Sequence, residues 1–301
     1  MNILFFGGTS FVSNNLIDCL AKRHDVTNIS RRRIKNIKNI YLDLKNKKTY
    51  RNLNKIKNKD IDILFFFSSY VPLKESNSSW HDCSDINVYS CIEILKYIKF
   101  KVKKIIISSS TSIYGQQNKV ELQENNFLNP DTGYAMSKFC QEHIFRIFCK
   151  ERNIKFLALR FGYVYSYKMN QSRLIIKIFK KFKNNEDIQI YNEDKINLNL
   201  IHINDLSKIT MKLMNKHQGI FNICSNKFIT LKSYISVLQK VFPDFKGRIY
   251  KFNDQKQKKM NSYSTIKMRK HVKNIKLITA GTRAVAGGDS YLWQASRHDV
   301  M

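Results

Sequence analysis

The sequence predicts an α/β protein in which a doubly wound parallel sheet is followed by a smaller C-terminal lobe. Apolar runs of strand length alternate along the chain with stretches that carry a helical period. The run from Ile61 to Phe67 has the length and apolar character of a parallel strand that helices cover on both faces. A chain of 301 residues is long enough to build such a core and a second lobe.

The first strand is expected from Asn2 to Phe6, and a glycine turn follows it. The turn reads Gly7-Gly8-Thr9-Ser10-Phe11-Val12-Ser13, and a helical period begins after it. A strand, a tight turn and a helix together aim backbone N–H groups at a phosphate. Ser10 and Ser13 stand where the pattern G-x-x-G-x-x-G has its second and third glycines, and the Cβ of a serine crowds such a turn. The pattern predicts a Rossmann-type dinucleotide-binding domain.

The second strand, Asp25 to Ser30, ends in Arg31-Arg32-Arg33 instead of an acidic residue. An Asp or Glu at this point accepts hydrogen bonds from the adenosine ribose of NAD, whereas an arginine suits the additional phosphate of NADP. The sequence therefore predicts NADP(H) in preference to NAD(H), with a solvated basic loop as the alternative interpretation.

Strands and helices continue to alternate up to the middle of the chain. The elements expected next are a strand ending in Tyr41-Leu42-Asp43-Leu44, a polar helix, the strand Ile61 to Phe67 closed by Ser68 and Ser69, a helix from Asp85 through Phe100, and a strand from Lys104 to Ser108. Asn87, in the first turn of the second helix, could cap or brace the ends of the strands.

A serine-rich strand end and a tyrosine–lysine pair carry the main chemical signal. Ser110 closes the run IIISSS, Tyr134 follows 24 positions later, and Lys138 lies one helical turn beyond it. A free phenol ionises near pH ~10, so acid–base use near neutrality needs a pKa shift of about 3 units. A lysine cation about 4 Å away supplies a shift of that order, and a serine can hold the same substrate oxygen. The alternative is a half-buried aromatic beside a solvated lysine.

With these motifs together, the chain resembles an extended short-chain dehydrogenase/reductase of the nucleotide-sugar epimerase and dehydratase type. The resemblance covers most of residues 1 to about 245. It is carried by the glycine turn, Asp43-Leu44, the strand ending at Ser69, Asn87, SSSTSIYG, YAMSK, Leu159-Arg160-Phe161-Gly162, the segment Leu200 to Leu206 and the segment Gly219 to Ile223.

The resemblance implies roles for individual residues. The implied catalytic residues are Ser110, Tyr134 and Lys138, and the implied cofactor-binding residues are Gly7, Ser10, Phe11, Val12, Arg31, Asp43, Leu44, Phe67, Ser68, Asn87, Tyr134 and Lys138. Phe67 and Ser68 would line the nicotinamide half of the cleft, and Lys138 would also hold a ribose. No metal ligand is implied.

Substrate contacts are expected from Ser110 and from Tyr163, which replaces an asparagine often found after the Arg160 strand. Asn197-Leu198-Asn199 replaces an arginine that commonly grips the nucleotide pyrophosphate in the family. Lys195 and Arg173 are the alternatives for that cation.

Departures from the family pattern favour one reaction. Thr111-Ser112 replaces the Asp-Glu pair of 4,6-dehydratases, which argues against water elimination, and the second strand lacks the acidic end usual in NAD-dependent epimerases. The expected function is NADP(H)-dependent reduction of a nucleotide-activated 4-keto (deoxy)hexose in surface-polysaccharide sugar biosynthesis. The alternatives are an NAD-dependent nucleotide-sugar 4-epimerase and a non-catalytic nucleic-acid or regulatory binding protein on the same fold.

Composition bounds the partners and the compartment. The formal charge is +30, but the lysines are dispersed among asparagines and isoleucines, which favours codon bias over a nucleic-acid partner. The six cysteines form no C-x-x-C pair, and no run approaches the ~20 apolar residues of a membrane span. The N-terminus lacks the features of a secretory signal. A cytoplasmic enzyme without a membrane partner is expected, and the family analogy adds a homodimer.

The expected division of the chain follows these signals. Residues 1–165 form the dinucleotide-binding domain, to which segments near 200–223 return, and residues 166–278 mainly form the substrate-binding lobe. After about Ile278 lysine disappears and alanine and glycine become frequent. Residues 279–301 are therefore expected to be an atypical tail, either of non-native or frame-shifted origin, or left by truncation of the final lobe, with a divergent native C-terminus as the alternative.

Overall fold

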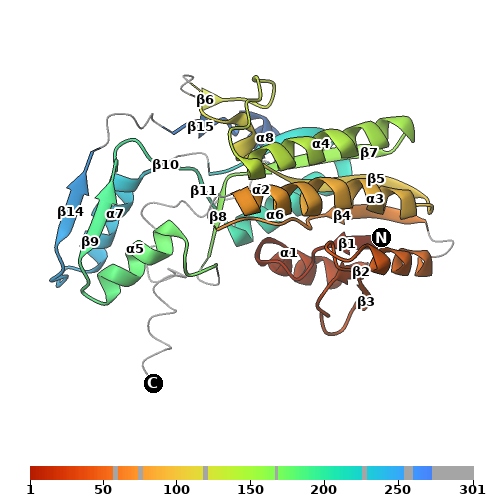
Figure 1. The fold of residues 1–301 in the computed structure, drawn as a ribbon, viewed down its shortest axis with the longest axis horizontal. Helices are drawn as coiled ribbons and strands as arrows, with labels where there is room; N and C mark the ends of the chain where they lie inside the picture. Colours follow the sequence, from red (N-terminus) through yellow and green to blue (C-terminus); the bar gives the residue numbers. More distant parts are fainter. Residues whose placement is uncertain are drawn as a thin grey trace.

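A seven-stranded parallel sheet lies at the centre of the computed structural model (Figure 1). The structure describes residues 1–56, 60–73, 77–117, 121–166, 169–225, 229–253 and 260–272. In spatial order the strands are β12 (Gly219–Ile223), β7 (Lys155–Phe161), β5 (Val102–Ser110), β4 (Ile61–Phe66), β1 (Asn2–Phe6), β2 (Asp25–Ser30) and β3 (Lys38–Tyr41). The predicted doubly wound sheet is confirmed. The strand order reverses between β1 and β4, and ligands of such sheets bind outside the carboxyl ends of the strands at that point.

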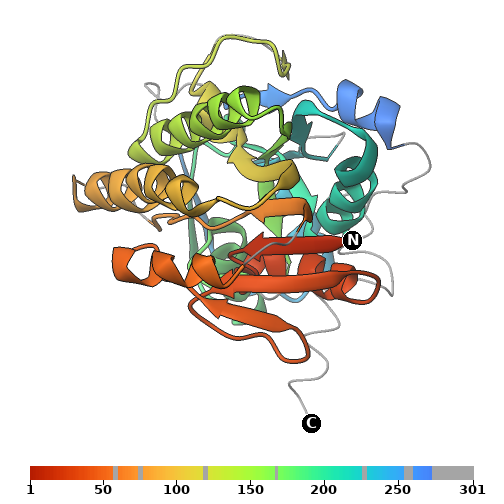
Figure 2. The ribbon, with the colours of Figure 1, turned by 90° about the vertical axis from the view of Figure 1, so that its right-hand side faces the viewer.

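Helices cover both faces of this sheet (Figure 2). One face carries α1 (Phe11–Ala21), α6 (Ile203–Lys216) and α8 (Ile266–His271), and the other carries η1 (Lys47–Lys55), α3 (Ser90–Tyr97) and α4 (Gly133–Glu151). Successive strand residues point to opposite faces, so Ile3 and Phe5 pack in one core and Leu4 and Phe6 in the other. This alternation explains why the strands are apolar throughout.

A third apolar cluster forms the core of a smaller lobe, seen at the left of Figure 1. Its elements are α5 (Leu174–Lys183), β9 (Ile188–Tyr191), β10 (Asn197–Leu198), β13 (Ile229–Thr230), α7 (Leu231–Val241) and β14 (Ile249–Phe252). Between the lobe and the main sheet, β8 (Tyr163–Tyr165) pairs in parallel with β11 (Leu200–His202). The chain thus crosses to the lobe and back beside the carboxyl end of β7.

Several elements differ from the sequence-based expectation. The helix expected from Asp85 through Phe100 is a π-helical segment, η2 (Ser84–Tyr89), continued by α3 and preceded by α2 (Asn77–Cys83). After β5 come η3 (Thr111–Tyr114) and β6 (Glu121–Leu122). β15 (Ser262–Tyr263) pairs with β6, and Met268 packs in a core of the main sheet. Both lie within residues 166–278, which the sequence predicts mainly as the smaller lobe. The atypical tail lies outside the described residues.

Candidate active site

Two adjoining cavities form a groove at the carboxyl ends of β1, β4 and β5. The larger has a volume of about 510 Å³ and the smaller about 370 Å³. They share the lining residues Ser10, Phe67, Ser69 and Val71. The groove therefore runs over the sheet at the position where the strand order reverses, which is where this topology predicts a ligand.

The glycine turn forms one wall of the larger cavity. Gly7 has a φ of +83°, and a Cβ at this position would lie 2.8 Å from the backbone nitrogen of Ser68, so only glycine fits. Ser10 caps α1: its hydroxyl accepts a hydrogen bond from the Ser13 backbone N–H at 3.3 Å and donates one to the Ser13 hydroxyl at 2.8 Å. The two serines that replace glycines thus satisfy each other, and Gly7, Thr9 and Ser10 before α1 line the larger cavity.

Cationic side chains line the larger cavity. Arg31, Arg32 and Lys45 line it together with Asp43, which is the only carboxylate among its described lining residues. The last residue of β2 is Ser30, whose hydroxyl donates a hydrogen bond to the Arg32 carbonyl at 2.6 Å. β2 therefore offers no carboxylate to a ribose here. Leu44, predicted with Asp43 as a cofactor contact, lines the same cavity.

Ser110, Tyr134 and Lys138 all line the smaller cavity, as their spacing predicts. Ser110 is the last residue of β5, and the other two lie in the first turns of α4. Thr132 fixes where that helix begins, because its hydroxyl accepts a hydrogen bond from the Ala135 backbone N–H at 3.1 Å. The end of the parallel strand β5 and the first turns of α4 thereby bring the three side chains to the wall of the smaller cavity.

The hydroxyl of Ser110 is oriented by its neighbour Ser112. It accepts hydrogen bonds from the Ser112 hydroxyl at 2.9 Å and from the Ser112 backbone N–H at 3.1 Å. Because a hydroxyl has two lone pairs and one proton, these contacts leave the Ser110 proton available towards the cavity. This role of Ser112 could not be predicted from the sequence, because it depends on the turn geometry of η3.

Burial raises the pKa of Tyr134 to about 12. A hydrogen bond with Ser110 and the cation of Arg173 act in the opposite direction. The net shift is upward, opposite to the lowering expected from the sequence, because burial outweighs the favourable contacts of the phenol.

Lys138 is buried, with 1% of its surface exposed. Its Nζ donates hydrogen bonds to the Oε1 atom of Gln141 and, at 3.4 Å, to the hydroxyl of Ser69. Burial lowers the pKa of Lys138 to about 8, while Cys91 and Glu142 act to raise it. The ammonium thus lies between the end of β4 and the second turn of α4.

Two of the predicted cofactor contacts have other positions. Asn87 lines neither cavity; its side chain accepts hydrogen bonds from the Ser69 hydroxyl (3.1 Å) and the Tyr70 N–H (2.7 Å), and donates to Ser137 (2.9 Å). It therefore braces the strand end. Ser68 lines the larger cavity and not the smaller one, because successive residues at a strand end point to opposite sides. Phe67 lines both cavities.

The remaining predicted residues lie on the smaller cavity. Phe11, Val12 and Tyr163 line it, and so does Arg173, whereas Lys195 does not. The Tyr163 hydroxyl is buried and has no hydrogen-bond partner among the described residues, and burial raises its pKa. An orphaned phenol beside a guanidinium is suited to a polar ligand.

Sequence reasoning missed several wall residues. These are Ser69, Val71, Ser108, Ser109, Phe161, Gly162, Val164, Met169 and Asn170. The serines could have been found, because they follow apolar strands whose carboxyl ends meet at one edge of a parallel sheet. Met169 and Asn170 carried no such signal.

Within the described part of the chain, no group of His, Cys, Asp and Glu is placed to hold a metal ion. None of the helices described has the length and apolar character of a membrane span.

Comparison with known proteins agrees with this architecture. The chain is 25% identical over 251 residues to a putative UDP-glucose 4-epimerase of Methanocaldococcus jannaschii, covering 79% of this chain and 81% of the relative. It is 28% identical to a dTDP-4-dehydro-6-deoxyglucose reductase of Escherichia coli, covering 59% and 58%. A Thermus thermophilus UDP-glucose 4-epimerase, solved as an NAD complex, superposes with a TM-score of 0.76 at 17% identity, covering 90% and 93%.

A family profile matches one continuous part of the chain. It spans residues 3–224, from β1 through β12, and so includes the glycine turn and the serine, tyrosine and lysine on the smaller cavity. Its description is that of an NAD-dependent epimerase/dehydratase. The chain therefore belongs to the NAD dependent epimerase/dehydratase family.

Proposed function

We propose that the protein reduces a nucleotide-linked 4-keto (deoxy)hexose with NADPH. One observation carries the proposal: the cavity that holds Ser110, Tyr134 and Lys138 opens into a second cavity lined by Arg31 and Arg32, to which β2 brings no carboxylate. The first cavity has groups for acid–base work at a carbonyl. The second has cations where an additional phosphate on the adenosine ribose would lie.

The groove has the features that a nicotinamide dinucleotide needs. Gly7 and the N-terminal turn of α1 would hold the pyrophosphate, Arg31 would pair with the 2′-phosphate, and Lys138 would hold the nicotinamide ribose. The reduced dinucleotide supplies the hydride when bound.

Side chains of the protein would supply the proton that the keto oxygen takes up during the reduction. Tyr134 would give its proton to the keto oxygen as negative charge develops there, and Ser110 would donate a hydrogen bond to the same oxygen. The high pKa of Tyr134 keeps the phenol protonated near neutrality, as an acid requires. Arg173 would help to stabilise the phenolate that remains, since its cation already acts to lower this pKa.

The substrate end of the groove favours an anionic nucleotide sugar. Arg173 and the orphaned Tyr163 hydroxyl would contact the diphosphate or the sugar, so Arg173 is preferred to Lys195 as the substitute cation. Dehydration is disfavoured, because the Thr111 hydroxyl donates to the Phe161 carbonyl at 3.3 Å and Thr111 does not line the cavity.

A second candidate is a nucleotide-sugar 4-epimerase. It is favoured by the match to the Methanocaldococcus relative over 81% of that protein. The same serine and tyrosine can take a proton from a hydroxyl and return it after the sugar has turned. This reaction would retain its dinucleotide and consume no reductant. A non-catalytic nucleic-acid binder is disfavoured, because all three acid–base residues share one cavity.

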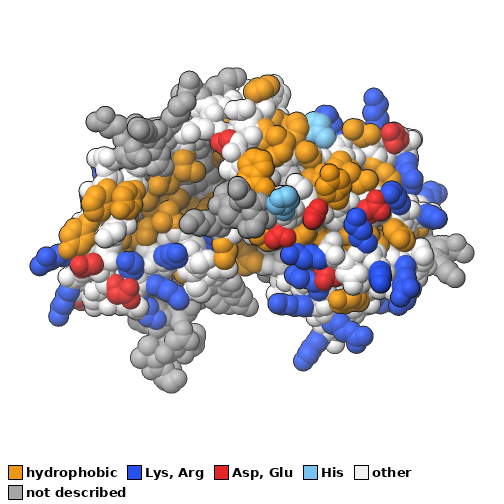
Figure 3. Space-filling model, viewed as in Figure 1, with side chains coloured by type: hydrophobic (Ala, Val, Ile, Leu, Met, Phe, Trp, Pro, Cys, Tyr) orange, Lys and Arg blue, Asp and Glu red, His pale blue; other side chains and the backbone are white. Residues whose placement is uncertain are grey.

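We further propose a homodimer formed through α2, α3 and α4. Hydrophobic side chains gather over these helices (Figure 3). Those with at least 40% of their surface exposed are Trp80, Ile92, Met136 and Ile147, and Tyr89 at the end of η2, directly before α3, is also exposed. A cluster of that kind on one face is characteristic of a protein–protein contact.

The test is an assay with purified protein and a panel of dTDP- and UDP-linked 4-keto-6-deoxyhexoses. We expect oxidation of NADPH with at least one of them, and a rate reduced by about 10²-fold or more in Tyr134→Phe. Interconversion of nucleotide sugars without net oxidation would replace the reductase by the epimerase. Turnover of no substrate in either assay, or an unimpaired Tyr134→Phe variant, would refute both.

A further inference from the structure

Gln141 has a buried side-chain amide that takes no part in the acid–base mechanism proposed above. It lies one turn after Lys138 on α4 and has no exposed surface. Its Oε1 atom accepts a hydrogen bond from the Lys138 ammonium. Its Nε2 atom donates to the Asn87 carbonyl at 3.3 Å and contacts the Cys91 sulfur at 3.2 Å.

These contacts fix which end of the amide faces the lysine. The carbonyl of Asn87 can only accept a hydrogen bond, so the NH₂ group of Gln141 must face it. The Oε1 atom is thereby turned towards Lys138. Asn87 itself is held by Ser69, Tyr70 and Ser137, so the anchor of the amide is a rigid part of the protein.

The titratable groups that affect Lys138 are few. Glu142, on the same helix, accepts a hydrogen bond from Ser109 and pairs with Arg160, and the Cys91 thiol, whose pKa burial raises to about 12, comes from α3. Both are among the groups that affect the ionisation of Lys138, but no carboxylate hydrogen-bonds to its Nζ among the described residues. The partner that α4 supplies to this ammonium is thus a neutral amide.

We propose that Gln141 is a positioning residue that holds the Lys138 ammonium at the wall of the smaller cavity through a neutral acceptor. The amide fixes the location of the ammonium without forming an ion pair, so the lysine keeps its hydrogen-bonding capacity for a ribose and can lose its charge at mildly alkaline pH. A carboxylate at the same place would fix the charge as well. The role in cofactor binding rests on the proposed function, but the contact itself does not.

The experiment compares Gln141→Glu and Gln141→Met with the wild type. Glu has nearly the same shape and adds a charge, whereas Met keeps the volume and removes the acceptor. Cys140→Ser, at the adjacent half-buried position of α4, is the matched control. The first readout is the free energy of unfolding in urea against pH, which needs no ligand. The second is the dissociation constant of NADPH against pH, measured by its fluorescence.

In the wild type we expect stability to rise as pH increases above about 8, because the unfolded chain keeps a proton that the folded Lys138 releases. Gln141→Glu should reduce this rise by restoring the charged form in the fold, and should move the alkaline loss of NADPH affinity upwards by about one pH unit or more. Gln141→Met should weaken NADPH binding roughly tenfold, with most of the affinity retained in Gln141→Glu at neutral pH. Cys140→Ser should match the wild type in both readouts.

Equal pH profiles in Gln141→Glu and the wild type would overturn the proposal, as would equal losses of NADPH affinity in Gln141→Glu and Gln141→Met.

If Gln141→Met does not fold, Cys91→Ala tests the anchor of the amide instead, because it removes one contact of the Gln141 side chain. An unchanged NADPH affinity in Cys91→Ala, together with an unshifted pH profile in Gln141→Glu, refutes the positioning role. A wild type that binds NADPH but reduces no 4-keto sugar refutes the proposed function alone. If no dinucleotide binds, the unfolding data still decide the Gln141 contact.

Discussion

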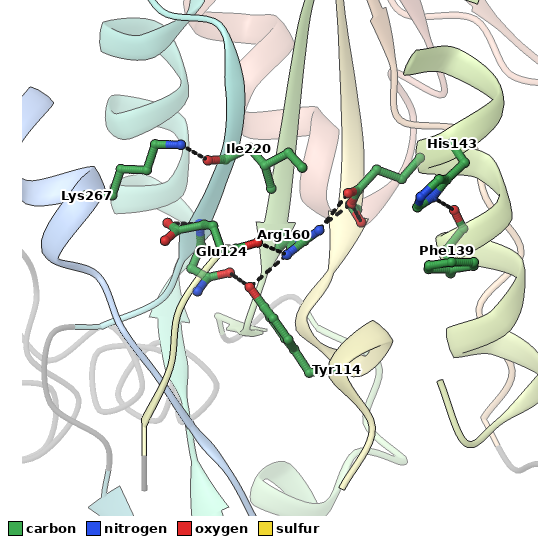
Figure 4. Close-up of polar contacts among 10 residues, drawn as sticks. Tyr114, Glu124, Phe139, His143, Arg160, Ile220 and Lys267 are labelled. Carbon is green, nitrogen blue, oxygen red and sulfur yellow. Dashed lines mark hydrogen bonds and ion pairs between the residues drawn. The ribbon is translucent and has the colours of Figure 1, made fainter. Parts of the chain in front are cut away.

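The guanidinium of Arg160 in β7 lies 2.7 Å from the carboxylate of Glu142 in α4, and each side chain is only 2% exposed. Glu142 also accepts a hydrogen bond from Ser109 at 2.7 Å, so one carboxylate joins α4 to both β5 and β7. The phenol of Tyr114 lies 2.8 Å from Arg160 and holds it from the other side (Figure 4). This pair therefore fixes the catalytic helix relative to the strand that carries Ser110.

The first prediction follows from the burial of this ion pair. Glu142→Gln leaves the Arg160 charge buried without a counter-charge, so the free energy of unfolding should fall by about 3 to 5 kcal/mol. Urea denaturation measures it. Asp25→Asn is the control, because Asp25 pairs with Lys38 at 3.1 Å while both side chains are about half exposed, and should cost less than about 1 kcal/mol. Similar losses in the two variants would contradict the buried pair's role.

The fold was predictable because its signal is local. The alternation of apolar runs and helical periods fixes the sheet, and the spacing of Ser110, Tyr134 and Lys138 places all three on one cavity. The side-chain contacts were not predictable, because they join residues far apart in sequence. Nothing in the pattern around Gln141 reveals the Asn87 carbonyl 54 positions earlier, and the pKa of Tyr134 depends on burial and on the Arg173 cation, which the local pattern does not show.

The second prediction concerns Ser112, whose hydroxyl donates to the Ser110 hydroxyl at 2.9 Å. Ser112→Ala removes this donor and lets the Ser110 proton turn away from the substrate oxygen. The loss of one neutral hydrogen bond of about 0.5 to 1.5 kcal/mol should lower kcat roughly twofold to tenfold with little change in KM. Steady-state kinetics of NADPH oxidation measures it. A larger effect than that of Ser110→Ala would exclude this indirect role.

The third prediction concerns stability at alkaline pH. Lys104 in β5 is buried and donates hydrogen bonds of 2.5 Å to the carbonyls of Met214 and His217 at the end of α6. Burial, aided by Lys155, lowers the pKa of Lys104 to about 8. The unfolded chain therefore binds one more proton between pH about 8 and about 10.5, so stability should rise with pH across this window.

Lys104→Met should reduce that rise by roughly 1 to 2 kcal/mol, as measured by urea unfolding at several pH values. The neutral amine still has two protons for the two carbonyls, so deprotonation itself costs little. Lys103→Met is the control: the pKa of exposed Lys103 is raised by Asp62, and its removal should leave the slope in this window unchanged. A steeper rise in Lys104→Met would show that the sign is wrong.

The fourth prediction separates the two dinucleotides. Arg31 lines the larger cavity where β2 supplies no carboxylate, and its charge would meet the 2′-phosphate of NADPH. Arg31→Ala should weaken NADPH binding by about 10-fold to 100-fold and leave NADH binding nearly unchanged, because a charge-assisted hydrogen bond contributes about 1.5 to 3 kcal/mol. Arg23→Ala, an exposed arginine outside this cavity, controls for net charge. An equal loss of affinity for both dinucleotides would show that Arg31 does not recognise the 2′-phosphate, and would remove the argument for NADPH over NADH.

The fifth prediction tests the proposed dimer face. Ile92 on α3 is 40% exposed and Ile147 on α4 is 54% exposed. If a second copy covers them, a lysine at either position places an ammonium in an apolar contact, where its desolvation is not compensated. Ile92→Lys and Ile147→Lys should each shift the sedimentation coefficient from that of a dimer to that of a monomer at micromolar concentration.

Ile266 provides a matched comparison on another face. It is 45% exposed on α8, which packs on the opposite side of the sheet from α3 and α4. Ile266→Lys makes the same chemical change and adds the same charge, so it should leave the dimer intact if only the α3 and α4 face is buried in it. A monomeric wild type would refute the dimer, and dissociation in all three variants would show that added charge, not the loss of a specific apolar contact, separates the subunits.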